Sequence, residues 1–159
     1  MRFYLIDRIT KMDIGKSIEG IKCWTLSDEI FNEHFPGFPV VPGVLITESM
    51  SQLLGILIEE SHKEIFNNKQ DVYALLSIIH NAKFRDIVIP GDKCEIRGKL
   101  KSIDLNRGSG FVEVFVDGKL MAEAALSFLI YSKDVLPVND FIHKRKEYFQ
   151  VITKKQPKR

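Results

Sequence analysis

The chain is short and nearly neutral. It has 159 residues, of which 45% are hydrophobic and 28% are charged, so we expect a single globular domain with a sizeable core and not a disordered chain. The formal net charge of +2 is too small to indicate nucleic-acid binding by itself. The acidic residue Asp7 near the N-terminus argues against a signal peptide. No apolar run approaches about 18 residues, which argues against a membrane span, so we expect a cytoplasmic protein.

The first part of the chain predicts one strand. Residues 2–10 are mixed and fit either a short helix or a short strand. Residues 17–26 are predicted to form a strand, although apolar side chains occur on both of its faces. The two cysteines, Cys23 and Cys94, are expected to be free, buried thiols, because no Cys-x-x-Cys pattern indicates a metal site.

A loop rich in proline and glycine leads into the longest predicted helix. His34 opens this loop, and three prolines and two glycines follow within nine positions, which disfavours both helix and paired strand. Residues 44–60 contain no proline and a single glycine, so a helix of about four to five turns is expected. One side of this helix is apolar. Small and polar residues share the other side: Glu48, Ser51, Gln52, Gly55 and Glu59.

Three features of this segment could carry chemistry. His34 is a candidate base, and Glu48, about one turn inside the helix, is a candidate acid. The N–H groups near Gly43 begin the helix, where they lack partners within the helix and the macrodipole is positive, so they could stabilise an oxyanion. A histidine in a loop and a glutamate on a polar helix face are also common at ordinary surfaces, so the residue types alone do not identify a site.

The second half of the chain predicts a sheet and one more helix. Strands are expected at residues 72–85, 93–102, 111–116 and 120–131. The first of them is strongly apolar over residues 72–79 and is predicted to be a core strand.

Two turns and a final helix complete this part. Arg107–Gly110 is predicted to be a hairpin turn. Asp117 and Gly118 tolerate a positive φ, which favours a two-residue turn of type I′. His62 has no cluster of partners and is expected at the surface. Asn139 or Asp140 can cap the final helix.

The order of residues in the loop and the long helix resembles a known active-site segment. His34-Phe-Pro-Gly-Phe-Pro-Val-Val-Pro-Gly43, followed by Glu48 and Gln52, is similar to that of the β-hydroxyacyl-(acyl carrier protein) dehydratases of type II fatty acid synthesis. Further matches occur at residues 81–85, 89–92, 116–119 and 122–124. The resemblance implies an α+β fold, the hotdog fold, in which one long central helix is wrapped by an antiparallel β-sheet. The predicted order of elements agrees with this fold.

The resemblance also implies a reaction. A (3R)-hydroxyacyl thioester on acyl carrier protein would lose water and become a trans-2-enoyl thioester. His34 would act as the base and Glu48 as the acid. The Gly43 N–H would bind the oxyanion, and Gln52 could orient Glu48, although a plain amide on a helix face is an equal alternative. Neither a metal nor a cofactor is implied. A glutamate at position 48 resembles the branch of the family that dehydrates without isomerising the double bond.

The partners implied are acyl carrier protein and further copies of the chain. In the resembled family two subunits pair edge to edge into a homodimer, three dimers can form a hexamer, and the site combines the histidine of one chain with the glutamate of the other. No nucleic-acid partner is implied. Two departures stand out: the His-Arg-Tyr-Pro-like stretch that precedes Phe3 in the family is missing, and Glu33 replaces a glycine before His34. We expect Glu33 to face solvent.

Other interpretations remain open. A thioesterase or an enoyl hydratase would share the fold, but the Asp-x-Asn-Pro-x-His pattern of the hydratase branch is absent. A non-catalytic subunit that interacts with an acyl carrier is a second alternative, and the presence of both His34 and Glu48 argues against it. Residues 1–138 are predicted to form the hotdog domain and residues 139–159 a basic helix and tail. This tail is either solvated or attracts an acidic partner, and nucleic-acid binding would rest on it alone.

Overall fold

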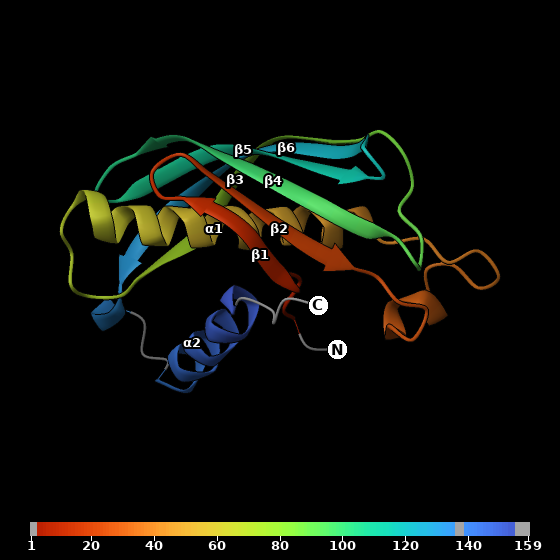
Figure 1. Ribbon diagram of the computed structural model, residues 1–159, viewed down its shortest axis with the longest axis horizontal. Helices are drawn as coiled ribbons and strands as arrows, with labels where there is room; N and C mark the ends of the chain where they lie inside the picture. Colours follow the sequence, from red (N-terminus) through yellow and green to blue (C-terminus); the bar gives the residue numbers. More distant parts are fainter. Residues whose placement is uncertain (1–2, 136–138, 155–159) are drawn as a thin grey trace.

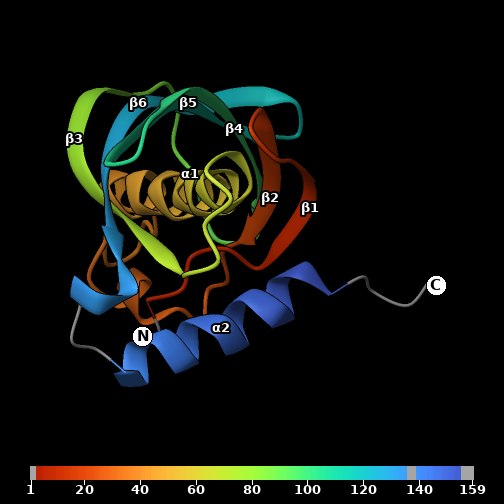
Figure 2. The same cartoon turned by 90° about the vertical axis from the view of Figure 1, so that its left-hand side faces the viewer.

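The computed structural model describes residues 3–135 and 139–154, and it consists of one long helix inside a curved sheet, with a second helix below (Figures 1 and 2). The long helix is α1 (Gly43–Ile65). The six antiparallel strands are β1 (Arg8–Asp13), β2 (Ser17–Cys23), β3 (Val72–Phe84), β4 (Lys93–Ile103), β5 (Arg107–Val116) and β6 (Lys119–Ser132), in the spatial order β1-β2-β4-β5-β6-β3. Two short 3-10 helices (Glu29–Asn32 and Lys133–Val135) and α2 (Asn139–Thr153) complete the described chain. The arrangement confirms the α+β hotdog fold.

Helix α1 is longer and more enclosed than its sequence pattern predicts. Its apolar side is fully buried against the sheet through Met50, Leu53 and Leu57, as expected. It continues to Ile65, past the predicted end at residue 60. The last turns still lie under the turn between β4 and β5, so the prediction that His62 lies at the surface is wrong. The His62 ring is buried, and its Nε2 lies 3.2 Å from the carbonyl oxygen of Leu105.

The prediction of a hairpin turn at Arg107–Gly110 is also wrong. These residues are the first part of β5, and the chain reverses at residues 104–106, where the Asp104 carboxylate accepts the N–H groups of Asn106 and Arg107 at 2.8 and 2.9 Å. The glycines are required instead because neighbouring elements lie close to the backbone at these positions. A Cβ on Gly108 would lie 2.8 Å from Ile58, and one on Gly110 would lie 2.4 Å from the carbonyl oxygen of Lys99.

The turn between β5 and β6 confirms the other hairpin prediction. Asp117 and Gly118 have φ values of 48° and 79°, which is the double positive φ of a type I′ turn.

Strand β3 is an edge strand rather than a core strand. Among the described residues it pairs with β6 alone, although its first residues are buried. From its middle onward the apolar side chains of Leu75, Ile78, Ile79 and Phe84 are exposed by 40 to 50%. The apolar run therefore does predict a strand, but within one chain much of this strand lacks a covering layer.

The cysteines are free, and Cys94 is buried as predicted. Cys23 is exposed, so the expectation that both thiols are buried is wrong for this residue. The alternation of β2 explains the difference, because Ile18 and Gly20 face the core and Cys23 falls on the other face. No helix among the described residues is both long enough and apolar enough to cross a membrane.

Helix α2 is docked against the body of the protein. The Tyr148 hydroxyl donates to the carbonyl oxygen of Ile6 and accepts the Ile6 N–H at 3.0 Å, and its ring stacks on Tyr4 with the ring centroids 4.2 Å apart. Ile152 is buried. The helix thus packs its apolar face on the N-terminal segment, as Figure 2 shows from the end of α1.

Candidate active site

His34 is held at the start of the loop by three hydrogen bonds. Its N–H donates to the carbonyl oxygen of Ile30 at 3.1 Å, and its own carbonyl oxygen accepts the Val40 N–H at 2.9 Å. The ring atom Nδ1 lies 2.7 Å from the Val40 carbonyl oxygen. Because a carbonyl oxygen only accepts, Nδ1 carries a proton, and in the neutral ring Nε2 is the atom with the lone pair. The half-buried ring therefore presents Nε2 as a base.

The start of α1 provides free backbone donors. Gly43 is the first helical residue, and the first N–H groups of a helix have no acceptor within it. The carbonyl oxygen of the preceding Pro42 accepts the N–H groups of Leu45 and Ile46 at 2.9 and 3.2 Å, which opens the helix in a regular way. A side chain at position 43 would collide with the Phe84 ring, whose atoms lie 3.0 to 3.2 Å from the place of a Cβ. Packing against Phe84 therefore also favours glycine at position 43, and the sequence alone does not show this.

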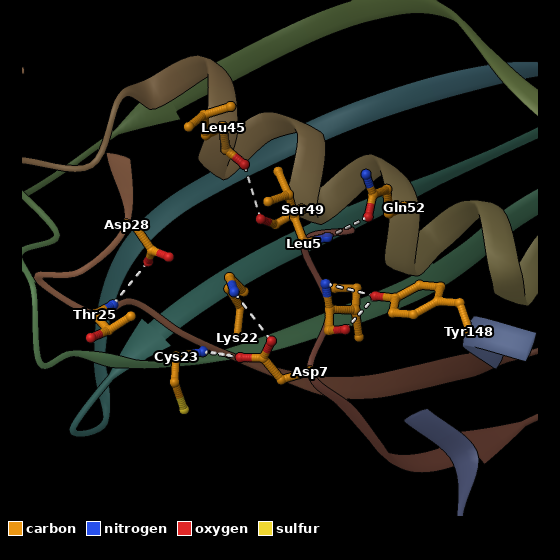
Figure 3. A network of polar contacts seen from close by, with 11 residues as sticks. Leu5, Asp7, Lys22, Cys23, Thr25, Asp28, Leu45, Ser49, Gln52 and Tyr148 are labelled. Atoms are coloured by element: carbon orange, nitrogen blue, oxygen red, sulfur yellow. Dashed lines mark hydrogen bonds and ion pairs between the residues drawn. The ribbon is translucent and has the colours of Figure 1, made fainter. Parts of the chain in front are cut away.

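Gln52 connects Glu48 to the N-terminal segment. Its Nε2 donates to Oε1 of Glu48 at 2.9 Å and to the carbonyl oxygen of Phe3 at 3.0 Å. Its Oε1 accepts the N–H of Leu5 at 2.8 Å, a contact drawn in Figure 3 together with the Tyr148 contacts to the same segment. All three groups hold the amide in place, so the Glu48 carboxylate has a fixed neighbour one helical turn away.

Glu48 and Gln52 face a cavity of about 560 Å³. The cavity lies between the polar side of α1, the first residues of β3, the N-terminal segment and α2. Ser51, Gly55, Ile56 and Glu59 continue its wall along α1. The helix side that the sequence marks as polar is thus the wall of a cavity, and not a solvated face.

The structure brings two of the four predicted site residues together and keeps the others apart from them. Glu48 and Gln52 share the cavity, whereas neither His34 nor Gly43 is among the described residues that line it. Glu33 is exposed, as predicted. The candidate base is therefore not part of the cavity that the candidate acid faces.

The cavity also contains an ion pair that the sequence did not predict. Arg145 of α2 donates to Oε1 of Glu59 at 2.6 Å, and the Ala74 N–H donates to the same oxygen at 2.8 Å. The guanidinium also lies 5.3 Å from the centre of the Tyr73 ring. Burial raises the pKa of the Glu59 carboxyl to about 7, against the opposing effect of the Arg145 charge. Glu59 continues the helical spacing of Glu48, but a partner 86 positions further along leaves no local signal.

Comparison with known proteins finds similar sequences among enzymes that share one name. The 3-hydroxyacyl-[acyl-carrier-protein] dehydratase of Campylobacter jejuni is 40% identical over 134 residues, which cover 82% of this chain and 89% of its own. The enzyme of the same name from Clostridium botulinum is 42% identical over 128 residues, covering 80% of this chain and 85% of its own.

Solved structures show the same fold at low sequence identity. A hot-dog-like protein from Thermanaerovibrio acidaminovorans superposes with a TM-score of 0.61 at 12% identity, over 91% of this chain and 96% of its own. The dehydratase heterocomplex ApeI:P from Xenorhabdus doucetiae superposes with a TM-score of 0.55 at 13% identity, over 75% of this chain and 92% of that chain. The family model of the FabA-like domain matches residues 1–125. The chain therefore belongs to the FabA-like family.

Proposed function

We propose that the protein dehydrates (3R)-hydroxyacyl-(acyl carrier protein) to trans-2-enoyl-(acyl carrier protein) in the synthesis of fatty acids or related lipids. Family membership and a sequence identity of about 40% to enzymes named for this reaction support the proposal. The observation that carries it is the state of the two candidate groups. The Val40 carbonyl oxygen holds Nδ1 of His34, which leaves Nε2 as the ring atom that can act as the base, and Glu48 faces a cavity that is large enough for an acyl chain.

The two proton transfers of the reaction require only His34 and Glu48. Nε2 of His34 takes the proton from C2, which the thioester carbonyl acidifies, and the negative charge moves to the carbonyl oxygen. The N–H groups at Gly43 stabilise that oxygen. The C2–C3 double bond then forms as the C3–O bond breaks, and the leaving hydroxyl takes a proton from Glu48 to become water. Return of the proton from His34 to Glu48 through solvent restores the enzyme.

The proposed active unit is a homodimer in which His34 of one subunit meets Glu48 of the other. Two features support this assembly. The two residues do not share a cavity within one chain, and β3 exposes apolar side chains at an open sheet edge, which a second β3 could cover. A trimer of such dimers is the further assembly that the family resemblance implies. The cytoplasmic location expected from the sequence is part of the proposal, and cell fractionation would test it.

A subunit-mixing experiment tests the shared site. Inactive His34→Ala subunits are mixed with inactive Glu48→Ala subunits and allowed to exchange. Each mixed dimer then has one site that lacks both groups and one complete site. Random pairing under two-fold symmetry should restore about a quarter of the wild-type activity. If exchange is confirmed by mass spectrometry and no activity returns, the shared site is refuted.

A product analysis tests the reaction itself. Hydroxyacyl, enoyl and simple acyl thioesters on acyl carrier protein are incubated separately with the protein and followed by mass spectrometry. Loss of one water from the hydroxyacyl substrate is the expected result. Release of a free acid from the simple acyl substrate would indicate a thioesterase instead, and no reaction with any substrate would favour a non-catalytic subunit.

A further inference from the structure

Helix α2 lies outside the part of the chain that carries the family resemblance. The family model ends at residue 125, whereas α2 spans Asn139–Thr153. Nevertheless α2 contributes Arg145, Tyr148 and Phe149 to the wall of the cavity that Glu48 faces. A helix beyond the range of the family model therefore shapes the space that the candidate acid faces.

Two ion pairs fix α2 across the end of the cavity that is far from Glu48. Arg145 contacts Glu59 of α1 at 2.6 Å, and Lys146 contacts Asp71, just before β3, at 2.8 Å. Asp71 also lies 3.3 Å from Lys63 of α1, so the same carboxylate connects both helices. At the other end, Tyr148 holds the N-terminal segment through Ile6, as Figure 3 shows. These contacts, which all come from one turn of α2, tie the helix to α1, to the residue before β3 and to the N-terminal segment.

The end of the cavity next to α2 is lined by different side chains from its middle. Ile56, Ala74 and Leu76 supply apolar surface there, but toward the far end the lining is charged. It carries the Glu59–Arg145 pair and, one helical turn further along α1, Lys63 with Asp71 and Lys146. An alkyl chain that extended this far would have to separate two charged groups or strip them of hydrogen bonds, which is unfavourable at a buried site. The far end is therefore a barrier to a longer alkyl chain.

We infer that α2, through Phe149 and the Arg145–Glu59 pair, is the end wall of the acyl site and sets the longest acyl chain that the protein accepts. This inference rests on the proposed function. Eleven residues separate Glu48 from Glu59, or about 16 Å along a helix with a rise of 1.5 Å per residue. A C–C bond of about 1.5 Å advances an extended chain by about 1.3 Å per carbon, so about twelve carbons beyond the reacting centre reach the wall.

Two substitutions of Phe149 test the wall in opposite directions. Phe149→Ala removes bulk from the cavity wall, and Phe149→Trp adds it. The probes are 3-hydroxyacyl pantetheine thioesters from about six to about sixteen carbons, a range that brackets the predicted limit. Lys144→Ala is the matched control, because Lys144 is an exposed residue of the same helix and does not line the cavity.

The measured quantity is the ratio of long-chain to short-chain kcat/KM. Phe149→Ala should raise this ratio by about tenfold, and Phe149→Trp should lower it, because a few methylenes in an apolar pocket change discrimination by that order. Lys144→Ala should keep the wild-type ratio. If the Phe149 variants keep the wild-type ratio, or lose activity equally at all lengths, α2 only stabilises the fold and the inference is wrong.

A binding measurement separates this inference from the proposed reaction. The same thioesters are titrated by calorimetry into Glu48→Gln protein with and without each Phe149 change. A length limit in binding that moves with Phe149 supports the wall even if the wild-type protein does not dehydrate hydroxyacyl-(acyl carrier protein). The absence of that reaction would refute the dehydratase proposal. If the probes are turned over and the longest accepted chain is the same in the Phe149 variants as in the wild type, the inference about the wall is wrong and the proposed reaction stands.

Discussion

The buried Glu59 carboxyl should make the stability of the protein depend on pH. Burial raises its pKa from the ordinary value of 4.5 to about 7. Between these two pH values the folded protein keeps a proton that the unfolded chain has lost. The free energy of unfolding therefore falls as the pH rises through this window, and the loss is complete above the folded pKa. A difference of about 2.5 pH units at about 1.4 kcal/mol each gives a loss of about 3 kcal/mol.

Glu59→Gln removes this titration while keeping an oxygen that can accept the Ala74 N–H and the Arg145 guanidinium. Urea unfolding of wild type and variant, at one protein concentration and at several pH values between about 4 and about 8, gives the difference in unfolding free energy. Relative to the variant, the wild type should lose up to about 3 kcal/mol across this range. Glu64→Gln, an exposed site on the same helix, is the control for loss of a carboxylate. A difference that stays constant, or that favours the wild type at high pH, would refute the assignment.

Three further predictions address the site, the packing and the partner. His34→Ala and Glu48→Gln should each lower kcat by about 10²- to 10⁴-fold while circular dichroism shows an intact fold; turnover at the wild-type rate in either variant contradicts the mechanism. Gly110→Ala should cost about 1 to 3 kcal/mol in urea unfolding, because a Cβ would lie 2.4 Å from a backbone oxygen, whereas Gly55→Ala meets nothing closer than 3.7 Å and should cost less. Binding to acidic acyl carrier protein should weaken as salt rises, and an unchanged KM at low salt after deletion of residues 153–159 would show that the tail takes no part.

Local sequence signals predicted the fold where a conformation depends on the residues themselves. Asp117 and Gly118 form the expected type I′ turn because tolerance of positive φ is a property of those two residues. The same reasoning failed at Gly108 and Gly110, since a glycine can be required either by backbone conformation or by the close approach of another element. Here Ile58 and Leu54 of α1 occupy the space of a side chain, and nothing near the glycines in sequence indicates that.

Long-range packing produced the other differences. His62 was predicted to be exposed because its neighbours in sequence are polar, yet the turn at Leu105 covers it. The side of α1 that carries Glu59 has a polar pattern, but α2 covers it through Arg145, which comes from the end of the chain. A helical wheel reports which side of a helix is polar, and it does not report whether another element will cover that side.

The candidate site likewise depends on contacts that the local sequence does not report, here contacts between subunits. The sequence places His34 and Glu48 fourteen positions apart on one short segment, and the family resemblance implies that each meets its partner from the other subunit. The loop holds His34 through Val40, and Gln52 holds Glu48, which faces a cavity that His34 does not line. In the homodimer that we propose, a second copy would supply the histidine to this cavity. The exposed apolar edge of β3 is the surface on which such a copy would pack.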